Sequence, residues 1–380
     1  MSNKFISGQN KIYFHKKEFE YNSFIPSLLN KPFDWENKKI NILLEEANEL
    51  LGRLDSCALL VPDINSYIQM HVTKEATIST RIEGTKTEID EAVLQKKDIA
   101  PEKRNDWIEV QNYINAMNYA IKQLEKLPLS MRLLNETHKF LLKGVRGQER
   151  LPGEIRTSQN YIGENIKNAY FIPPHPETLP DLLSDLEKFW HNENILVPRL
   201  IKVALTHYQF ETIHPFCDGN GRLGRLLITL QLINYKILRK PILYISDYLE
   251  KNKGLYYDSL TIVRQTHNIE QWITFFLTGI INSSRKGTET FEKIITLRMR
   301  YEDIIRTFGR QTPLGQKLLL YLFSRPVVDI PIIANEFSIA YNTASSIVKK
   351  MVKAGLLNPV KINPKRNFFV LTEYFNLFKE

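Results

Sequence analysis

The chain has 380 residues, and at roughly 100–200 residues per domain this length predicts two or three domains. Hydrophobic residues make up 43% and charged residues 24%, which excludes a wholly disordered chain, a collagen and a coiled coil. The formal net charge of +9 is compatible with an anionic partner.

Cys57 and Cys217 are too few to build a disulfide framework or a cysteine-rich zinc site. The first residues lack the apolar core of a signal peptide, and no apolar run reaches membrane-spanning length. We therefore expect a cytoplasmic protein that does not enter a membrane.

Helical periodicity dominates the chain after an irregular, Pro- and Asn-rich arm at 26–34. From 40 to 60, apolar residues recur three, four and seven positions apart, as on one face of an amphipathic helix. The same spacing predicts further helices over 66–83, 107–127, 130–142, 180–191, 198–212, 220–238 and 255–264, and two more within 270–308.

Residues 151–176 differ from the helical segments around them. Alternating residues, Gly163, Asn165 and Asn168 indicate a short β-hairpin, which the pair Pro173–Pro174 ends. We therefore expect a β-flap inside an otherwise helical domain.

The C-terminal segment changes character again. Helices over 313–323, 331–337 and 341–354, with a short strand near 327–330, precede two strands joined by an Asn-Pro-Lys-Arg turn. This order resembles the winged-helix family, an α+β fold. Residues 311–380 hold nine Lys or Arg against four Asp or Glu, so more than half of the net charge lies here.

The third helix of this segment offers side chains that suit DNA. Its groove-facing candidates are Asn342, Thr343, Ser345 and Ser346, and its phosphate-facing candidates are Lys349, Lys350 and Lys353. A protein-docking or dimerisation module is the alternative interpretation of the same segment.

One segment carries the pattern of a catalytic loop, and it reads His214-Pro215-Phe216-Cys217-Asp218-Gly219-Asn220-Gly221-Arg222-Leu223-Gly224-Arg225. Its first two glycines permit tight turns, so that backbone N–H groups and a helix N-terminus can converge on an anion. Arg222 and Arg225 are three residues apart, where both can hold phosphate oxygens. Asp218 is placed to hold Mg²⁺ together with the phosphates, and His214 to act as a general base on a hydroxyl.

The same string resembles, position by position, the signature of the Fic family: His-Pro-Phe, any residue, Asp or Glu, Gly-Asn, Gly or Lys, Arg, two residues, Arg. The resemblance covers roughly residues 60–280, and no defining position departs from it. Fic-domain adenylyltransferases move AMP from ATP onto a Tyr, Thr or Ser hydroxyl of a target protein and release pyrophosphate. The resemblance thus implies ATP as substrate and Mg²⁺ as cofactor.

The resemblance also implies roles for individual residues. His214 would be the base, Asp218 the metal ligand and Arg225 the γ-phosphate contact. Asn220, Gly221 and Arg222 would hold the α- and β-phosphates, and the other nucleotide-binding positions of the loop would be Gly219, Leu223 and Gly224.

Earlier in the chain, Ser79, Glu83 and Gly84 form a second pattern at the end of the predicted helix 66–83. Gly84 suits a helix C-cap, whereas the helix dipole disfavours a carboxylate there, so another group is expected to hold Glu83. The pattern resembles the inhibitory motif of Fic proteins. This resemblance implies that Glu83 lies in the nucleotide site, pairs with Arg225 and inhibits the enzyme in cis.

The predicted flap resembles the hairpin on which Fic proteins dock a target as an added strand. The matching residues are Gly153, Arg156, Ile162, Gly163 and the two prolines, with Asn160 and Tyr170 near the substrate or nucleotide. Tyr256, Tyr257 and Leu260 lie where related proteins line the adenine pocket, although helix core packing explains them equally well.

The predicted fold is mainly α, with a Fic-type helical domain, its β-hairpin flap and a C-terminal winged-helix domain. We expect an N-terminal arm and helical region in 1–105 (inhibitory helix about 66–84), the catalytic domain in 106–285, a linking helix in 286–311 and the winged-helix-like domain in 312–380.

The expected function is AMP transfer from ATP to a hydroxyl of a target protein. Two alternatives stay open: removal of AMP by hydrolysis, with Glu83 orienting a water, and a DNA-binding regulator that uses the Fic domain as a nucleotide sensor. Three further expectations concern the partners of the chain: self-modification, DNA binding through 312–380 and formation of a homodimer.

Overall fold

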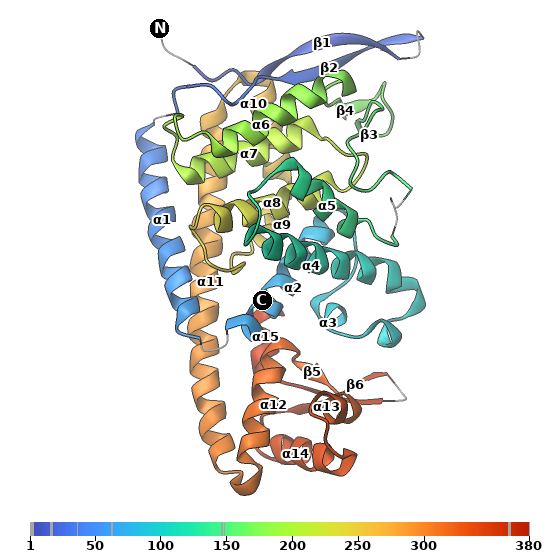
Figure 1. Ribbon diagram of the computed structural model, residues 1–380, viewed down its shortest axis with the longest axis vertical. Helices are drawn as coiled ribbons and strands as arrows, with labels where there is room; N and C mark the ends of the chain where they lie inside the picture. Colours follow the sequence, from blue (N-terminus) through green and yellow to red (C-terminus); the bar gives the residue numbers. More distant parts are fainter. Residues whose placement is uncertain are drawn as a thin grey trace.

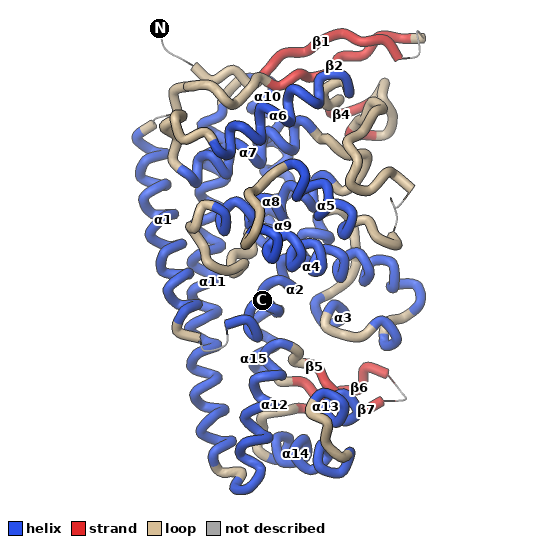
Figure 2. The backbone as a smooth tube through the Cα atoms, in the orientation of Figure 1, coloured by secondary structure: helices blue, strands red, loops and turns tan. Residues whose placement is uncertain are grey.

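The computed structural model describes residues 4–15, 18–35, 37–61, 64–145, 147, 149–363 and 366–379. The molecule is elongated, with an N-terminal hairpin at one end and the C-terminal unit at the other (Figure 1). Helices make up most of it, and the strands of the described residues form three small sheets (Figure 2). The predicted mainly α fold is confirmed. None of the described helices combines the length and apolar character needed to span a membrane.

The N-terminal segment forms a β-hairpin that the sequence analysis missed. β1 (Gly8–His15) pairs antiparallel with β2 (Phe19–Pro26). Ile12 and Phe14 are exposed on this hairpin, while β2 buries several of its own apolar residues. Apolar residues on both faces remove the alternation that identifies a half-buried strand.

The helical body consists of eleven helices in the described part of the chain: α1 (Lys38–Leu59), α2 (Ile64–Ile82), α3 (Ile89–Ala92), α4 (Arg104–Leu124), α5 (Met131–Leu141), α6 (Leu179–His191), α7 (Arg199–Ile213), α8 (Asn220–Asn234), α9 (Ser246–Lys251), α10 (Lys253–Thr266) and α11 (Ile269–Arg306). Short 3₁₀ turns occur at Lys96–Asp98, Pro101–Lys103, Pro176–Thr178 and Gly309–Gln311.

The helices α7 and α8 pack against each other and are buried along nearly their whole length. One buried hydrogen bond joins them, since the Gln231 amide nitrogen donates to Thr206 Oγ1 at 3.1 Å. Helices α2, α4 and α5 pack on α8, and α6 packs on α7. The connection between the two central helices is therefore surrounded by rigid elements.

Helix α11 is one helix of 38 residues, so the two helices predicted here are wrong, and the expected boundary at 285/286 falls inside it. Helix α1 lies beside it and runs in the same direction (Figure 1). A Cβ on Gly287 would lie 2.9 Å from Leu54 Cδ1, so this glycine permits the close approach. Buried serines and glycine replace large apolar residues in the middle of α11, which interrupts the apolar period that sequence analysis follows.

The predicted β-flap is present between α5 and α6. β3 (Ile162–Gly163) pairs antiparallel with β4 (Ala169–Phe171), with an irregularity between the two residues of β3. Gly163 has φ of 141°, and a Cβ there would lie 2.9 Å from the Ala169 Cα, so the short turn requires glycine.

The C-terminal unit follows the predicted order of elements. It contains α12 (Thr312–Ser324), β5 (Val327–Val328), α13 (Ile330–Glu336), α14 (Tyr341–Lys353), β6 (Asn358–Asn363) and β7 (Arg366–Val370), with strand order β5-β7-β6. The final helix α15 (Thr372–Lys379) was not predicted. The winged-helix assignment itself stays a prediction.

Helix α2 connects this C-terminal unit with the body. Tyr67 near its start stacks on Phe323 of α12 with ring centroids 4.5 Å apart, and His71 packs against Phe378 of α15. Strand β7 adds a second contact, since its first residue, Arg366, pairs with Asp98 at 2.8 Å. The other end of α2 carries the predicted inhibitory residues, so the helix spans from the C-terminal unit to the candidate site.

Candidate active site

The predicted phosphate-binding loop joins α7 to α8. His214 ends α7 in a left-handed conformation with φ of 50°, and Gly219 adopts φ of 75° directly before α8. Only the glycine takes this conformation without steric cost. Contacts from outside the loop therefore have to hold His214.

Arg156 supplies these contacts. Its Nε donates to His214 O at 2.8 Å, and its terminal nitrogens donate to the carbonyls of Ser158, Pro174 and Ile213. The side chain is 2% exposed, and burial lowers the pKa of Arg156 to about 10. We predicted Arg156 in the target-docking surface. The structure corrects this, because its donors are bound to main-chain carbonyls and hold the flap against the loop.

Asn220 closes the loop onto itself. Its Oδ1 accepts from Phe216 N at 2.9 Å, and its Nδ2 donates to Phe216 O at 2.8 Å. Because both ends of the amide are occupied, the predicted phosphate contact falls to the backbone N–H of Asn220 in the first turn of α8.

His138 is a residue beside the loop that the sequence analysis did not identify. Gly153 N donates to its Nδ1 at 2.8 Å, which leaves Nε2–H to donate to Asp218 O at 2.8 Å. Its ring stacks on Phe216, with centroids 4.0 Å apart. Burial lowers the pKa of His138 to about 4, so the neutral ring keeps this tautomer. No spacing in the sequence marked it.

His214 is the first residue of the loop, directly after α7. Its Nδ1 is 3.4 Å from Glu211 O, an arrangement that directs Nε2 away from α7 as the proton acceptor. Burial lowers the pKa of His214 to about 4, and the positive charge of Arg156 acts in the same direction. The ring is therefore neutral at pH 7, as a general base must be.

We expect the His214 imidazole to stay neutral as the pH falls from 7 to 5. Since its pKa is lowered to about 4, protonation begins only well below the value of an ordinary histidine. An unperturbed histidine with pKa about 6.5 would be mostly protonated at pH 5. Side-chain NMR titration of the intact protein measures this, with His214→Gln to assign the signal. A midpoint near 6.5 would contradict the burial of this ring.

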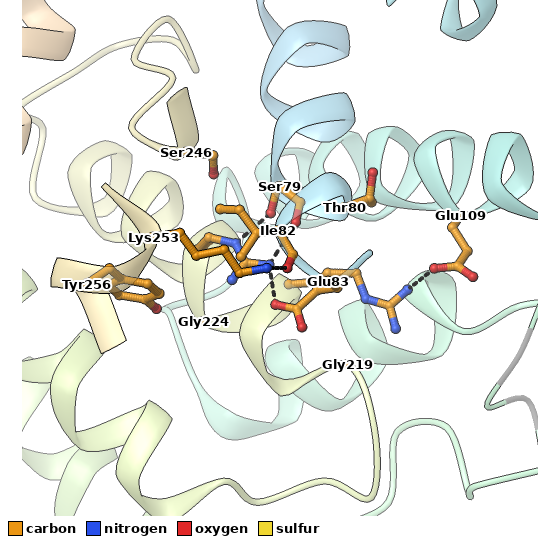
Figure 3. Close-up of polar contacts among 12 residues, drawn as sticks. Ser79, Thr80, Ile82, Glu83, Glu109, Gly219, Gly224, Ser246, Lys253 and Tyr256 are labelled. Carbon is orange, nitrogen blue, oxygen red and sulfur yellow. Dashed lines mark hydrogen bonds and ion pairs between the residues drawn. The ribbon is translucent and has the colours of Figure 1, made fainter. Parts of the chain in front are cut away.

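Arg225 of α8 forms the predicted pair with Glu83 (Figure 3). Its Nη2 lies 2.6 Å from Glu83 Oε1, its Nε donates to Ser79 Oγ at 2.9 Å, and Nη2 also donates to Ser79 O at 2.8 Å. The Arg225 side chain is 1% exposed, whereas that of Glu83 is 36% exposed. Burial alone would raise the pKa of Glu83, but the Arg225 charge outweighs it and holds the pKa below its usual value.

Two glycines of the loop are required by neighbouring carboxylates. A Cβ on Gly221 would lie 2.3 Å from Glu83 Oε1, and one on Gly224 would lie 2.2 Å from Glu211 Oε1. Gly84 has φ of 103°, which ends α2 and turns Glu83 toward the loop. Gly221 and Gly224 thus leave room for the carboxylates of Glu83 and Glu211. This steric role is additional to the tight turns that the sequence analysis inferred for the first two glycines of the loop.

Arg222 is paired on two sides. Its Nη1 donates to Glu109 Oε2 of α4 at 3.0 Å (Figure 3). Its Nη2 donates to Asp218 Oδ1 at 3.3 Å. Glu109 was not predicted, because one acidic residue on an amphipathic helix resembles any solvated charge. The pair orients the Arg222 guanidinium beside the loop.

Asp218 fits a role in holding Mg²⁺. Its side chain is 34% exposed, and Gly219 N donates to its Oδ1 at 2.6 Å. Its Oδ2 lies against Gly147, where a Cβ would come within 2.6 Å. In the described residues no cluster of three His, Cys, Asp or Glu side chains could hold an ion. One carboxylate combined with phosphate oxygens is a donor set that Mg²⁺ accepts.

The residues predicted for the adenine pocket separate in the structure. Tyr256 and Leu260 are buried in the core, and the Tyr256 hydroxyl is 2.9 Å from His207 Nε2. Tyr257 is 42% exposed and remains a candidate for contact with a base. Leu223 is fully buried, so its side chain packs in the core and does not reach a nucleotide.

The flap keeps some of its predicted residues at the surface. Ile162 is 41% exposed and Tyr170 is 90% exposed, so both are available to a partner. The Asn160 amide instead donates to Phe216 O at 3.2 Å and joins the flap to the loop.

Two further groups shape the site without a sequence signal. The Lys253 amine of α10 donates to Ile82 O at 2.7 Å and holds the end of α2 (Figure 3). Glu75 of α2 accepts hydrogen bonds from Ser246, and burial raises its pKa to about 7. Both are contacts between segments distant in sequence.

The comparisons with known proteins cover this loop and the helix α2. The family described as Fic/DOC family N-terminal matches residues 42–122, and the Fic/DOC family matches residues 128–232. Residues 42–122 and 128–232 are therefore Fic/DOC family domains. The Fic match contains the loop through Arg225, and the N-terminal match contains Ser79 and Glu83.

Curated relatives carry the same domain. The Fic segment is 30% identical over 144 residues to protein adenylyltransferase fic-1 of Caenorhabditis elegans, which covers 37% of this chain and 27% of that protein. It is 31% identical over 180 residues to protein adenylyltransferase Fic of Drosophila grimshawi, covering 39% and 35%. The chain thus spans about a third of the length of these curated relatives.

Solved structures share the fold. A Fic family protein from Desulfovibrio desulfuricans G20 superposes with a TM-score of 0.58 at 20% identity, over 90% of this chain and 98% of that one. A Fic domain containing signaling protein from Bacteroides thetaiotaomicron gives 0.53 at 18% identity, over 65% and 98%. At these identities the likeness concerns the Fic fold alone.

Proposed function

We propose that this Fic protein transfers AMP from ATP to a hydroxyl side chain of a target protein and releases pyrophosphate. The observation that carries the proposal is the loop between α7 and α8, where His214, Asp218, Arg222 and Arg225 meet the N-terminus of α8. The curated relatives named protein adenylyltransferase support it.

The chemistry is an in-line displacement at the α-phosphorus. Neutral His214 accepts the proton of the target hydroxyl, whose oxygen forms the new bond to the α-phosphorus. The bond from the α-phosphorus to the bridging oxygen breaks, and its electrons leave with pyrophosphate. The N-terminal N–H groups of α8 and the Arg222 guanidinium stabilise the charge on the phosphates. Mg²⁺ held by Asp218 would neutralise part of that charge.

Inhibition in cis is part of the proposal. Glu83 holds Arg225, the outermost arginine of the loop, as a charge-assisted pair at 2.6 Å. While this pair is formed, the guanidinium cannot hold the γ-phosphate, and the triphosphate lacks its outer contact. Ser79 and Lys253 support the inhibited arrangement by fixing Arg225 and the end of α2.

Labelled nucleotides test the activity directly. We expect α-³²P-ATP with Mg²⁺ to label the protein or an added target, and γ-³²P-ATP to label neither, because only the α-phosphorus is transferred. Label from the γ-position would indicate a kinase instead. Label from neither isotope, in wild type and in Glu83→Gly, would contradict the proposed transfer.

Removal of AMP is a second candidate at the same site. The Glu83 side chain is 36% exposed although Oε1 contacts Arg225, so the carboxylate also faces solvent and can orient a water. Hydrolysis of an AMP-modified protein by wild type, and its loss in Glu83→Gln, would favour this direction.

A DNA-binding regulator is favoured by the exposed face of α14. Asn342, Thr343, Lys349 and Lys353 are exposed, while the Lys350 amine is bound to Phe308 O at 2.7 Å. The winged-helix assignment and DNA binding are proposals on this ground. We also propose that the protein modifies a separate target protein and itself. A homodimer and a cytoplasmic location are further parts of the proposal. The free thiols of Cys57 and Cys217 suit a reducing compartment.

We expect the full chain to bind duplex DNA weakly, with affinity that falls as salt rises, because phosphate contacts release counterions. Replacing Lys349 and Lys353 together by Gln should weaken binding and lower the salt slope by about 0.9 per lost phosphate contact. The exposed Lys122→Gln of α4 serves as a control. If the DNA shows no mobility shift at low salt, the C-terminal unit is a protein-docking module instead of a DNA-binding one.

A further inference from the structure

A groove lies between the N-terminal hairpin and the flap, outside the loop described above. It has a volume of about 830 Å³, and its walls come from β2, from β4 and from the C-terminal half of α10. This volume falls within the range of about 300–1,000 Å³ that ligand sites occupy. Sequence analysis did not find it, because β1 and β2 were not predicted.

The two walls are strands that lie side by side in the same direction. Phe24 N of β2 donates to Ile172 O just after β4 at 3.0 Å, and the Lys167 amine lies 4.5 Å from the Phe19 ring. In an antiparallel pair, backbone groups point outward at every second residue. The backbone N–H of Phe24 points outward from the β1–β2 pair. The backbone N–H and C=O of Asn22, two residues earlier, therefore point outward as well and face the groove.

Arg264 of α10 forms the floor of the groove. Its guanidinium carbon lies 3.8 Å from the Phe171 ring, and its Nε donates to Leu260 O at 3.0 Å. In the described part of the chain no carboxylate forms an ion pair with it, and its two terminal nitrogens have no hydrogen-bond partner. Burial lowers the pKa of Arg264, which shows that the charge is partly desolvated. The Glu211 carboxylate acts on this charge without forming an ion pair with it. A partly desolvated guanidinium whose terminal nitrogens carry no hydrogen bond favours an anionic ligand.

The rest of the lining limits which anion fits. Glu20 is the one acidic residue among the described residues that line the groove, and Lys167 lies over the Phe19 ring. A phosphate with two charges would face the Arg264 guanidinium and the Lys167 amine, but also the Glu20 carboxylate. A carboxylate with one charge matches the guanidinium fork, and the wall amides of Asn10 and Gln265 suit peptide groups.

The groove is close to the candidate active site. Tyr257 and Arg264 are seven residues apart on α10, which corresponds to about 10 Å along the helix. The charge of Arg264 also affects His214. An extended chain covers about 10 Å in three residues, which equals the length of α10 between Arg264 and Tyr257.

We propose that this groove binds an acidic side chain of the target protein, about three residues from the hydroxyl that receives AMP, through the guanidinium of Arg264. Tyr170 and the outward backbone of Asn22 contact the segment that carries the acid. The proposal rests on the proposed AMP transfer, and it adds a preference for acidic targets that the catalytic loop does not provide.

Binding of defined peptides to the full-length protein tests the groove without requiring catalysis. The probes are fluorescein-labelled alanine nonapeptides with a central Tyr and a Glu three residues before or after it, each with a Gln counterpart. We expect one Glu peptide to bind about tenfold tighter than its Gln counterpart, as a charge-assisted hydrogen bond provides. Arg264→Gln should abolish the difference, and Arg264→Lys should keep part of it.

A variant that is expected to strengthen peptide binding separates the loss of a direct contact from a loss of structure. Glu20→Gln removes the acid from the groove wall and should tighten binding of the Glu peptide, an effect that damage to the fold does not produce. Arg306→Gln, exposed at the end of α11, is the matched control and should change nothing. Thermal melts establish that Arg264→Gln is folded.

Equal binding of Glu and Gln peptides, including no measurable binding of either, would overturn the proposal. So would a preference for Glu that persists in a folded Arg264→Gln. The proposed function fails separately: if α-labelled ATP marks no protein while Arg264 still selects Glu peptides, the groove stands and AMP transfer does not. If transfer occurs without this selection, the groove alone is refuted.

Discussion

Glu83→Gly should label itself and its targets strongly with AMP where wild type labels them weakly. The Glu83 carboxylate occupies Arg225 at 2.6 Å, so its removal frees the outermost guanidinium for the γ-phosphate. It also deletes a negative charge beside the triphosphate. Gel labelling with α-³²P-ATP measures the gain, and the rise in melting temperature with ATP should be larger in the variant than in wild type.

Three comparisons establish the cause of that gain. Arg225→Ala added to Glu83→Gly should cancel it, because the freed contact is lost. ADP, which has no γ-phosphate, should bind wild type and variant more equally than ATP does. Glu250→Gly removes a carboxylate near Arg81 that does not contact Arg225, and it should leave labelling unchanged. If Glu83→Gly transfers AMP no faster than wild type, the proposed inhibition in cis is wrong, although a hydrolytic role for Glu83 stays open.

His214→Ala in the Glu83→Gly background should reduce AMP transfer by about 10²–10⁴-fold, the usual contribution of a general base. Nucleotide binding should remain near that of the parent, because the α8 N-terminus, Arg222 and Arg225 do not depend on the imidazole. Single-turnover transfer and ATP affinity, measured on the same preparation, separate the two quantities.

Cys217→Ala is the matched control for the base. Cys217 lies in the same loop at the variable position of the pattern, and its thiol is free. We expect near-parental transfer from this variant. Transfer at the parental rate by His214→Ala, or its loss in Cys217→Ala, would contradict the assignment of His214 as base.

The local spacing of the loop was sufficient to predict an anion-binding loop, and the resemblance to the Fic family added AMP transfer. Two glycines and two arginines directly before an apolar helix predict an anion site, because a helix N-terminus and its first turn are built from consecutive residues. The flap was predictable for the same reason, since a short turn depends on Gly163 and its neighbours. The resemblance to the Fic family then supplied Glu83 as the partner of Arg225, and the contact is present at 2.6 Å.

Positions that depend on distant partners were predicted less well. Arg156 carries a charge typical of a surface residue, yet it is 2% exposed and holds His214 in place, because the carbonyls of Ile213 and His214 converge on it together with those of Ser158 and Pro174. The resemblance made Tyr256 and Leu260 candidates for the adenine pocket, with core packing as the alternative, and both lie in the core. The continuous α11 was missed because its buried face uses small residues against α1.

The sequence by itself therefore determined the mainly helical fold, the flap and the glycine- and arginine-containing loop with its candidate base, since each depends on residues close together in the chain. Tertiary structure alone decided that Arg156, His138 and Glu109 hold that loop in place and that Lys253 holds the end of α2, and it formed the groove around Arg264. Those features depend on distances between segments that are as much as 240 residues apart, as between β2 and α10. Local patterns do not encode such distances, because they arise only when the helices pack.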